Sequence, residues 1–191
     1  GHEDDARTFA SLAEEFRASL LDSLRRSMAY HRIDYLPGCV ELGDFDAPKT
    51  TVALFPVDEA GLNNQGRLPL AAVEATFDRY WSFFVDRRDG ATKTTWEAYT
   101  PYENRAIGAL VRLGRRDRAH DLVRYFLDDQ RPRGWNAFAE VVWRDPTRPS
   151  FIGDIPHTWC GSDYVNSFRS LFVYEREVDN ALVLFHGVTR E

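Results

Sequence analysis

The residues best suited to chemistry lie in one stretch, from Gly134 to Asp163, where acids, aromatic rings and a histidine alternate. Glu140 stands inside an aromatic run, and Asp154 and His157 follow it close to glycine and proline breaks. A sugar site needs aromatic faces beside carboxylates, because pyranose C–H faces pack on rings while the hydroxyls bond to charged groups. The alternative is that the Trp residues of this stretch bridge helix ends and that Glu140 pairs with an arginine such as Arg144.

A second acidic loop precedes this stretch and has the sequence VELGDFD, which contains Glu41, Asp44 and Asp46. Glycoside hydrolysis uses two carboxyl groups, one that donates a proton to the leaving oxygen and one that activates water or attacks carbon. We therefore expect Glu140 to act together with Asp46 or Asp44. The alternative is that both Asp residues form turns by accepting hydrogen bonds from their own loop backbone.

Residues of both loops and of a helix start are expected to bind the substrate. They are Trp135, Trp143, Trp159, Tyr102, Glu103, Glu41, Asp154 and His157. Two of them have a structural alternative. His157 is also placed to cap or pack against the last helix, and Glu103 to close a capping box with Thr100 as the N-cap.

Composition excludes several classes of protein. The 191 residues include 43% apolar residues, enough for a core, and the net charge of -6 disfavours a nucleic-acid partner. Only Cys39 and Cys160 occur, without the Cys/His spacing of a zinc site, so neither a metal nor another cofactor is expected. No apolar run approaches the roughly 20 residues of a membrane span. Nothing in the chain indicates its localisation.

The apolar periodicity predicts a series of helices. They are expected over about 5–34, from Pro69 to about Asp89, from Pro101 to Leu113, from Arg115 to Asp129, and from His157 or Ser162 to Glu177. A long loop is expected from Cys39 to Gly66, with one short extended piece at 50–55, and a strand-like end at 181–185. The third and fourth helices should form a tight antiparallel hairpin, because only Gly114 separates them.

These elements predict an all-α fold of antiparallel helical hairpins that forms part of a helical toroid. Short and long connections alternate, so the long loops 39–66 and 134–156 are expected on one face.

The order of four segments carries a resemblance to a known family. These segments are VELGDFD, TPYENRAIGALVRLGRRDRAHDLVRYFL, WNAFAEVVWRDP and FIGDIPHTWCGSDYVNSFRSLFVYE. From about Tyr35 onwards the chain resembles the C-terminal half of bacterial six-hairpin, (α/α)6-barrel glycosidase-like proteins. It is more distantly similar to inverting processing α-glucosidases and trehalases. In those enzymes the general acid is an Asp in a glycine-containing loop, and the general base is a Glu in a late aromatic loop.

The resemblance implies Asp46 or Asp44 as the acid and Glu140 as the base. In the relatives the Asp stands two residues after the loop glycine, a position held here by Phe45, so both Asp residues stay candidates. A six-hairpin barrel has twelve helices, about twice what the periodicity predicts here. We therefore expect a single helical domain over 1–191 that is a C-terminal fragment or half of a larger barrel.

The sequence is compatible with three functions. The first is a carbohydrate-active hydrolase domain that works by acid and base chemistry. The second is a non-catalytic carbohydrate-binding module, and the third a helical module for interaction or oligomerisation. The expected partners are a carbohydrate and either further copies of this chain or the remainder of a longer chain, since exposed apolar helix faces would need cover.

Overall fold

The computed structural model describes residues 1–55, 67–90, 101–128, 130, 133–143, 147 and 152–189. The α-helices in these ranges are α1 (Glu3–His31), α2 (Ala47–Thr50), α3 (Leu70–Arg88), α4 (Arg105–Arg112), α5 (Arg116–Asp128) and α6 (Thr158–Phe172). Short 3-10 turns are η1 (Thr51–Ala53), η2 (Pro101–Asn104) and η3 (Glu177–Asp179). Strands β1 (Val173–Arg176) and β2 (Ala181–Leu184) form an antiparallel hairpin in which Val173 pairs with Leu184. The chain is therefore largely all-α.

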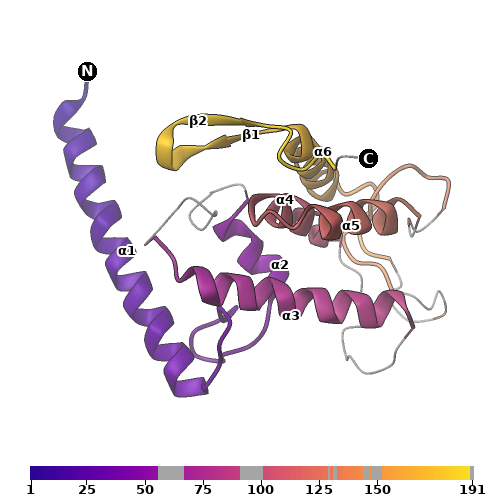
Figure 1. Ribbon diagram of the computed structural model, residues 1–191, viewed down its shortest axis with the longest axis horizontal. Coiled ribbons are helices and arrows are strands. Elements are labelled where there is room, and N and C mark those ends of the chain that lie inside the picture. The colour runs from indigo at the N-terminus through magenta and orange to yellow at the C-terminus, as the bar shows by residue number, and fades with distance from the viewer. Residues whose placement is uncertain are drawn as a thin grey trace.

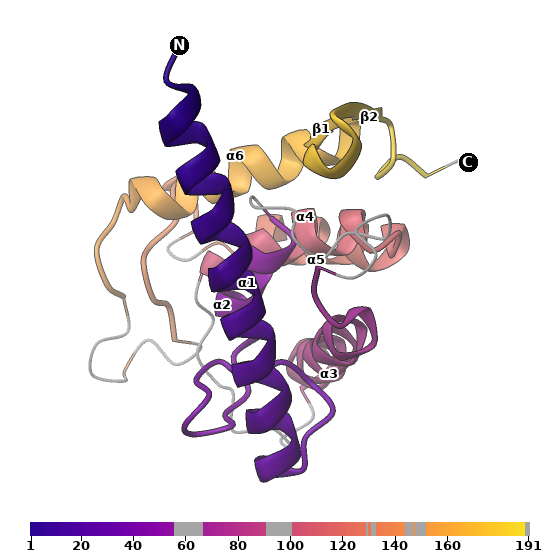
Figure 2. The same ribbon diagram turned by 90° about the vertical axis from the view of Figure 1, so that its left-hand side faces the viewer.

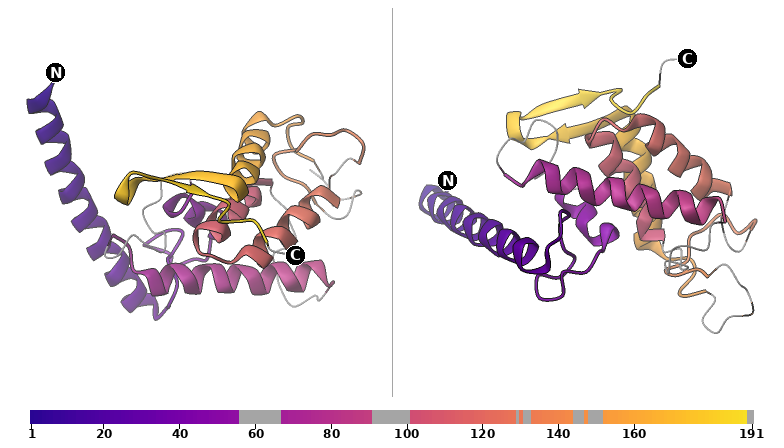
Figure 3. Two further views of the ribbon diagram at one scale, coloured as in Figure 1. Left: turned by 45° about the horizontal axis from the view of Figure 1, so that its top comes forward. Right: turned by 60° about the horizontal axis from the view of Figure 1, so that its bottom comes forward.

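The helices stack in three levels (Figure 1). Helix α6 and the β1–β2 hairpin lie on one side of the α4–α5 pair, and α3 lies on the other side. The order is the same in the view turned by 90° (Figure 2). Helix α1 runs beside this stack, and its N-terminal part projects away from the rest (Figure 3). Helices α4 and α5 form the middle level and therefore have other elements on two sides.

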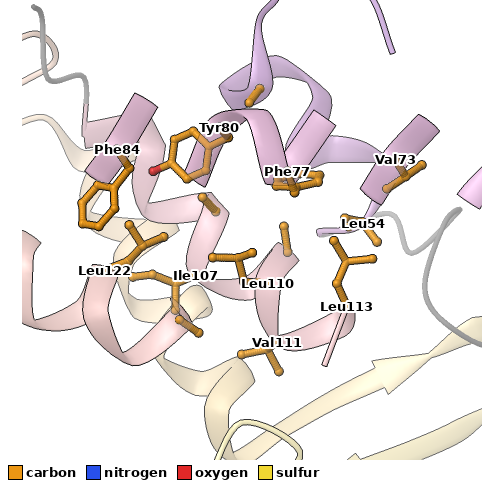
Figure 4. Packing of buried hydrophobic residues seen from close by; sticks show 14 of the residues in the cluster. Leu54, Val73, Phe77, Tyr80, Phe84, Ile107, Leu110, Val111, Leu113 and Leu122 are labelled. Atoms are coloured by element: carbon orange, nitrogen blue, oxygen red, sulfur yellow. The ribbon is translucent and has the colours of Figure 1, made fainter. Parts of the chain in front are cut away.

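Helix α4 is buried along its whole length from Ala106 to Arg112. Its apolar side chains meet those of α3 and α5 (Figure 4), where Phe77, Phe84 and Leu122 are at most 1% exposed. Burial of one such side chain stabilises the fold by about 1.5–3 kcal/mol. Gly108 permits close packing, since a Cβ there would lie 3.0 Å from the ring of Phe55. The predicted α4–α5 hairpin is present, and Gly114 turns it with a φ of 69°.

One ion pair lies inside this core. Arg87 of α3 donates two hydrogen bonds to the carboxylate of Glu103, at 2.8 and 2.7 Å, and the Tyr80 hydroxyl donates a third at 3.0 Å. Glu103 is 0% exposed. Burial disfavours the charge of Arg87, but the Glu103 carboxylate outweighs this and raises the pKa of the guanidinium. The pair thus fixes η2 to α3.

Glu103 is therefore inaccessible to a substrate, in contrast to the expected binding role. Its carboxylate is fully buried and accepts hydrogen bonds from Arg87 and Tyr80. Its proposed N-cap partner, Thr100, lies outside the described residues.

The sequence was right about α1, α3, α5 and the final strand, and wrong about two shorter pieces. Residues 47–53 are helical, although a loop with a short extended piece at 50–55 was expected there, because Asp46 caps α2 by accepting the backbone N–H of Lys49 at 3.1 Å. The last helix ends at Phe172 instead of Glu177, because Val173–Arg176 pairs with β2. The common face predicted for the two long loops stays a prediction, since parts of both loops lie outside the described residues.

None of the helices described here is both long enough and apolar enough to cross a membrane.

Candidate functional site

Two segments, 138–143 and 152–157, lie side by side before α6. Val142 and Ile152 form an antiparallel bridge, and Glu140 donates its backbone N–H to the carbonyl of Asp154 at 3.0 Å. Glu140 and Asp154 each stand two residues from the bridge, so they face one another across the two segments. The backbone N–H of His157 closes the end of this pairing on the carbonyl of Phe138, at 2.8 Å.

The paired segments bring three ionisable side chains together. One donor atom from each of Glu140, Asp154 and His157 lies within 4.8 Å of the others. Glu140 and His157 are half-buried, and Asp154 is exposed. The sequence singled out all three residues for substrate binding or catalysis, and the structure places them in one cluster.

A parallel pair of helices supplies the second side of the cluster. Arg105 bonds to Asp163 at 2.7 Å, and Arg112 bonds to Ser170 at 3.2 Å, so the same offset of 58 residues relates α4 to α6 at both points. The two helices therefore run in the same direction and begin at the same end. This brings η2, which precedes α4, next to the first turn of α6.

Tyr102 of η2 connects this side to the cluster. Its hydroxyl lies 3.1 Å from Nε2 of His157, and its ring meets the ring of Trp159 edge to face at 5.8 Å. The guanidinium of Arg105 stacks near both rings, at 5.1 Å from Tyr102 and 5.5 Å from Trp159. Arg87 holds the adjacent Glu103 in the core, and this fixes the backbone that carries Tyr102.

Burial and negative charge together alter the titration of groups around the cluster. Burial raises the pKa of the Tyr102 hydroxyl, and the charges of Cys160 and Glu140 add to this. Burial also raises the pKa of the Cys160 thiol, to about 12, so this cysteine is no nucleophile at neutral pH. Asp163 likewise has a raised pKa because of burial, although Arg105 opposes the shift.

The two Asp residues proposed as acids serve their own loop. Asp44 accepts the backbone N–H of Cys39 at 2.8 Å, and Asp46 caps α2 and pairs with the ammonium of Lys49 at 2.8 Å. The hydrogen bond that the Lys49 ammonium donates to Asp46 raises the pKa of Lys49. Both Asp residues therefore accept hydrogen bonds from the backbone of their own loop, which is the structural alternative considered in the sequence analysis. Their pairing with Glu140 stays a prediction.

The other proposed contacts differ in accessibility. Trp159 and Trp135 are 59% and 63% exposed, and Trp143 is half-buried. Glu41 is exposed, and its carboxylate accepts a hydrogen bond from the Cys39 thiol at 3.0 Å, which lowers the pKa of the acid. Of the three Trp residues, Trp159 is the one in ring contact with Tyr102.

Sequence reasoning missed Arg105 and Asp163. Their bond joins positions 58 residues apart, and neither residue stands in a local pattern that marks it. The signal that could have found them is the position of each in the first turns of its helix, combined with the parallel packing of α4 on α6. This packing is part of the tertiary structure, so no local sequence pattern indicates it.

No protein-family model, curated protein or solved structure matches this chain.

Proposed function

We propose that the cluster at the start of α6 is a carbohydrate site in which Glu140 acts as an acid–base group in glycosidic bond hydrolysis. The observation that carries the proposal is the half-buried Glu140 carboxylate in one cluster with Asp154 and His157, which Tyr102 connects to the exposed ring of Trp159. Sugars bind where a flat apolar face and charged hydrogen-bonding groups adjoin. The paired segments supply the charged groups, and Trp159 in the first turn of α6 supplies the apolar face.

Trp159 is the proposed stacking surface. Its ring contacts Tyr102 and Arg105, and Trp159 is still 59% exposed, so part of the indole is accessible to solvent. An indole held in this way loses little conformational freedom when a pyranose packs on it. Asp154 and His157 are the groups proposed to bond to hydroxyls.

The second carboxyl group of the reaction is proposed to be Asp46 or Asp44, as the family resemblance implies. Asp154 suits an inverting mechanism poorly, because its carboxylate oxygen lies within 4.8 Å of that of Glu140, whereas inversion needs about 6.5–9.5 Å between carboxyl groups. The hydrogen bonds that Asp44 and Asp46 make within their loop favour the second function, a site that binds sugar without cleaving it.

Substitution of the stacking residue tests sugar recognition. Trp159→Ala should weaken saccharide affinity by about 2–10-fold, because an aromatic contact contributes about 0.5–1.5 kcal/mol beyond its buried area. Titration calorimetry with a panel of oligosaccharides measures this. Val165→Ala, an exposed apolar residue two turns further along α6, is the matched control and should bind as the wild type does. Equal affinity of Trp159→Ala and wild type would remove Trp159 from the site.

The exposed stripe of α1 favours an additional role in assembly. Apolar residues recur at three- and four-residue steps along this helix, but only its C-terminal part, at Leu24 and Met28, packs on the core. The outer part of the stripe is exposed: Phe9 by 68%, Leu12 by 47%, Phe16 by 78% and Leu20 by 49%. We propose that a second copy of the chain covers it, and that the hairpins described here form part of a larger helical toroid.

The wild-type protein is accordingly expected to be a homodimer or higher oligomer at concentrations of tens of micromolar. Phe16→Glu should shift it to the monomer, since a charge in the middle of an apolar interface is left without solvation. Multi-angle light scattering distinguishes these states. Glu15→Gln, on the same helix and exposed, is the control and should remain oligomeric. A monomeric wild type would contradict the proposal.

A further inference from the structure

We propose that Glu140, Asp154 and His157 bind a first-row divalent metal ion, with Zn²⁺ as the best fit. The three residues offer two carboxylate oxygens and one imidazole nitrogen, all within 4.8 Å of one another. An ion at about 2.0–2.2 Å from each donor brings the donors to about 3–4 Å from each other. Rotation of the exposed Asp154 side chain and the half-buried Glu140 side chain would bring the donors to this separation.

The backbone holds the two carboxylates opposite each other, where a bound cation would offset their repulsion. The backbone bond from Glu140 to the Asp154 carbonyl sets these residues opposite each other on paired segments. Like charges directly opposite each other on neighbouring strands are destabilising. A divalent ion between the carboxylates converts this repulsion into attraction, and His157 completes a three-ligand set.

Gly153 keeps the space beside the Glu140 carboxylate open. A Cβ at this position would lie 3.3 Å from Cβ of Glu140 and 3.7 Å from its Oε2. A side chain at this position would therefore contact the residue that we assign as a ligand. This feature is independent of the three donors and belongs to the segment that carries Asp154.

The donor types select the class of ion. Imidazole nitrogen suits Zn²⁺ and its first-row neighbours, whereas Ca²⁺ and Mg²⁺ prefer oxygen ligands throughout. Three protein ligands leave at least one coordination position open for water or a substrate oxygen, as in catalytic zinc sites. Coordination through one oxygen leaves the second oxygen of Glu140 available for the chemistry proposed above.

Tyr102 is the proposed positioning residue for the ligand His157. Its hydroxyl lies 3.1 Å from Nε2, and a hydrogen bond to one ring nitrogen fixes the orientation in which the other nitrogen can donate to a metal. Tyr102→Phe keeps the ring and removes the hydroxyl. This change should lower metal affinity by about 10-fold, within the 10–100-fold range of such outer-shell losses.

Metal binding is measured on the chelator-stripped protein by titration calorimetry with ZnCl₂ and by metal analysis after dialysis. We expect about one Zn²⁺ per chain, weaker binding of Ca²⁺ and Mg²⁺, and loss of more than about 10-fold in affinity for Asp154→Asn and His157→Gln. His2→Ala is the matched control and should bind as the wild type does, since His2 is an exposed histidine beside an acid, Asp5, outside the site. Circular dichroism establishes that each variant is folded.

The visible spectrum of the Co²⁺-substituted wild type gives a second measurement that does not require a variant. Absorption from an ion held by nitrogen and oxygen ligands is the expected result. No Zn²⁺ or Co²⁺ bound by the wild type, unchanged binding by both ligand variants, or tighter binding of Ca²⁺ than of Zn²⁺ would each overturn the proposal. These experiments contain no saccharide, so their failure would leave the carbohydrate proposal standing, and the failure of sugar binding would leave this one standing.

Discussion

Glu103→Gln is expected to lower the free energy of unfolding by about 3–5 kcal/mol, the usual cost of leaving one member of a buried ion pair without its partner. Arg87 and Glu103 have side chains that are only 6% and 0% exposed. The variant keeps the shape of residue 103 but removes the charge that compensates the Arg87 guanidinium. Urea unfolding followed by circular dichroism measures the difference.

Two control variants separate this effect from a general loss of charge. Glu175→Gln removes one partner of an ion pair between Arg169 and Glu175 that is exposed, at 44% and 63%, and should cost less than about 1 kcal/mol. The double variant Arg87→Met with Glu103→Leu removes both buried charges and should recover most of the lost stability. If Glu103→Gln unfolds within 1 kcal/mol of the wild type, the pair does not stabilise the core as described.

The position of the helices could be predicted because apolar periodicity is a local signal. Phe77, Tyr80 and Phe84 recur at the spacing that puts them on one side of α3, and all three are buried there. For α1 the periodicity predicted a helix equally well. It could not predict that Phe16 would stay exposed, because exposure depends on what packs against the helix.

The same distinction applies to Glu103, whose place in the core was not predicted. Its sequence position, three residues after a threonine and near a helix start, is typical of a capping box. The side chain instead enters the core, because Arg87 on a different helix provides two hydrogen bonds and a charge. A partner 16 positions away leaves no local trace in the sequence.

Much of the candidate site was predictable because its residues are close in sequence. Glu140, Asp154 and His157 come from a single stretch rich in aromatic residues, and they lie in one cluster. The role of Arg105 was not predictable, since it depends on the parallel alignment of α4 with α6. The sequence also contains no indication of the metal site proposed above, because the cluster depends on the pairing of two segments and not on any Cys/His spacing.

Glu140→Gln is expected to lower turnover of a glycoside substrate by about 10²–10⁴-fold, the contribution of one general acid or base. Glutamine retains the shape and hydrogen-bonding reach of the side chain but neither accepts a proton nor attacks carbon. Saccharide binding should persist, because Trp159 and the remaining polar groups are unchanged. Steady-state hydrolysis of aryl glycosides by wild type and variant gives the ratio of kcat values.

Asp128→Asn is a suitable control for this comparison. Asp128 ends α5 as an exposed carboxylate and is not part of the cluster, so its loss should leave turnover at the wild-type rate. Wild-type turnover by Glu140→Gln would exclude Glu140 from the mechanism. A wild type that binds saccharide but shows no turnover would instead favour the non-catalytic carbohydrate-binding function.

We propose that a carbohydrate binds at the cluster of Glu140, Asp154 and His157 together with Trp159. Its most direct test is a two-dimensional NMR titration of the ¹⁵N-labelled protein with a panel of oligosaccharides, which reports the indole N–H and the backbone of each segment separately. We expect saturable chemical shift changes at the Trp159 indole and over 138–143 and 152–159 with at least one saccharide. Shifts confined to other parts of the chain, or no shift with any saccharide at millimolar concentration, would contradict it.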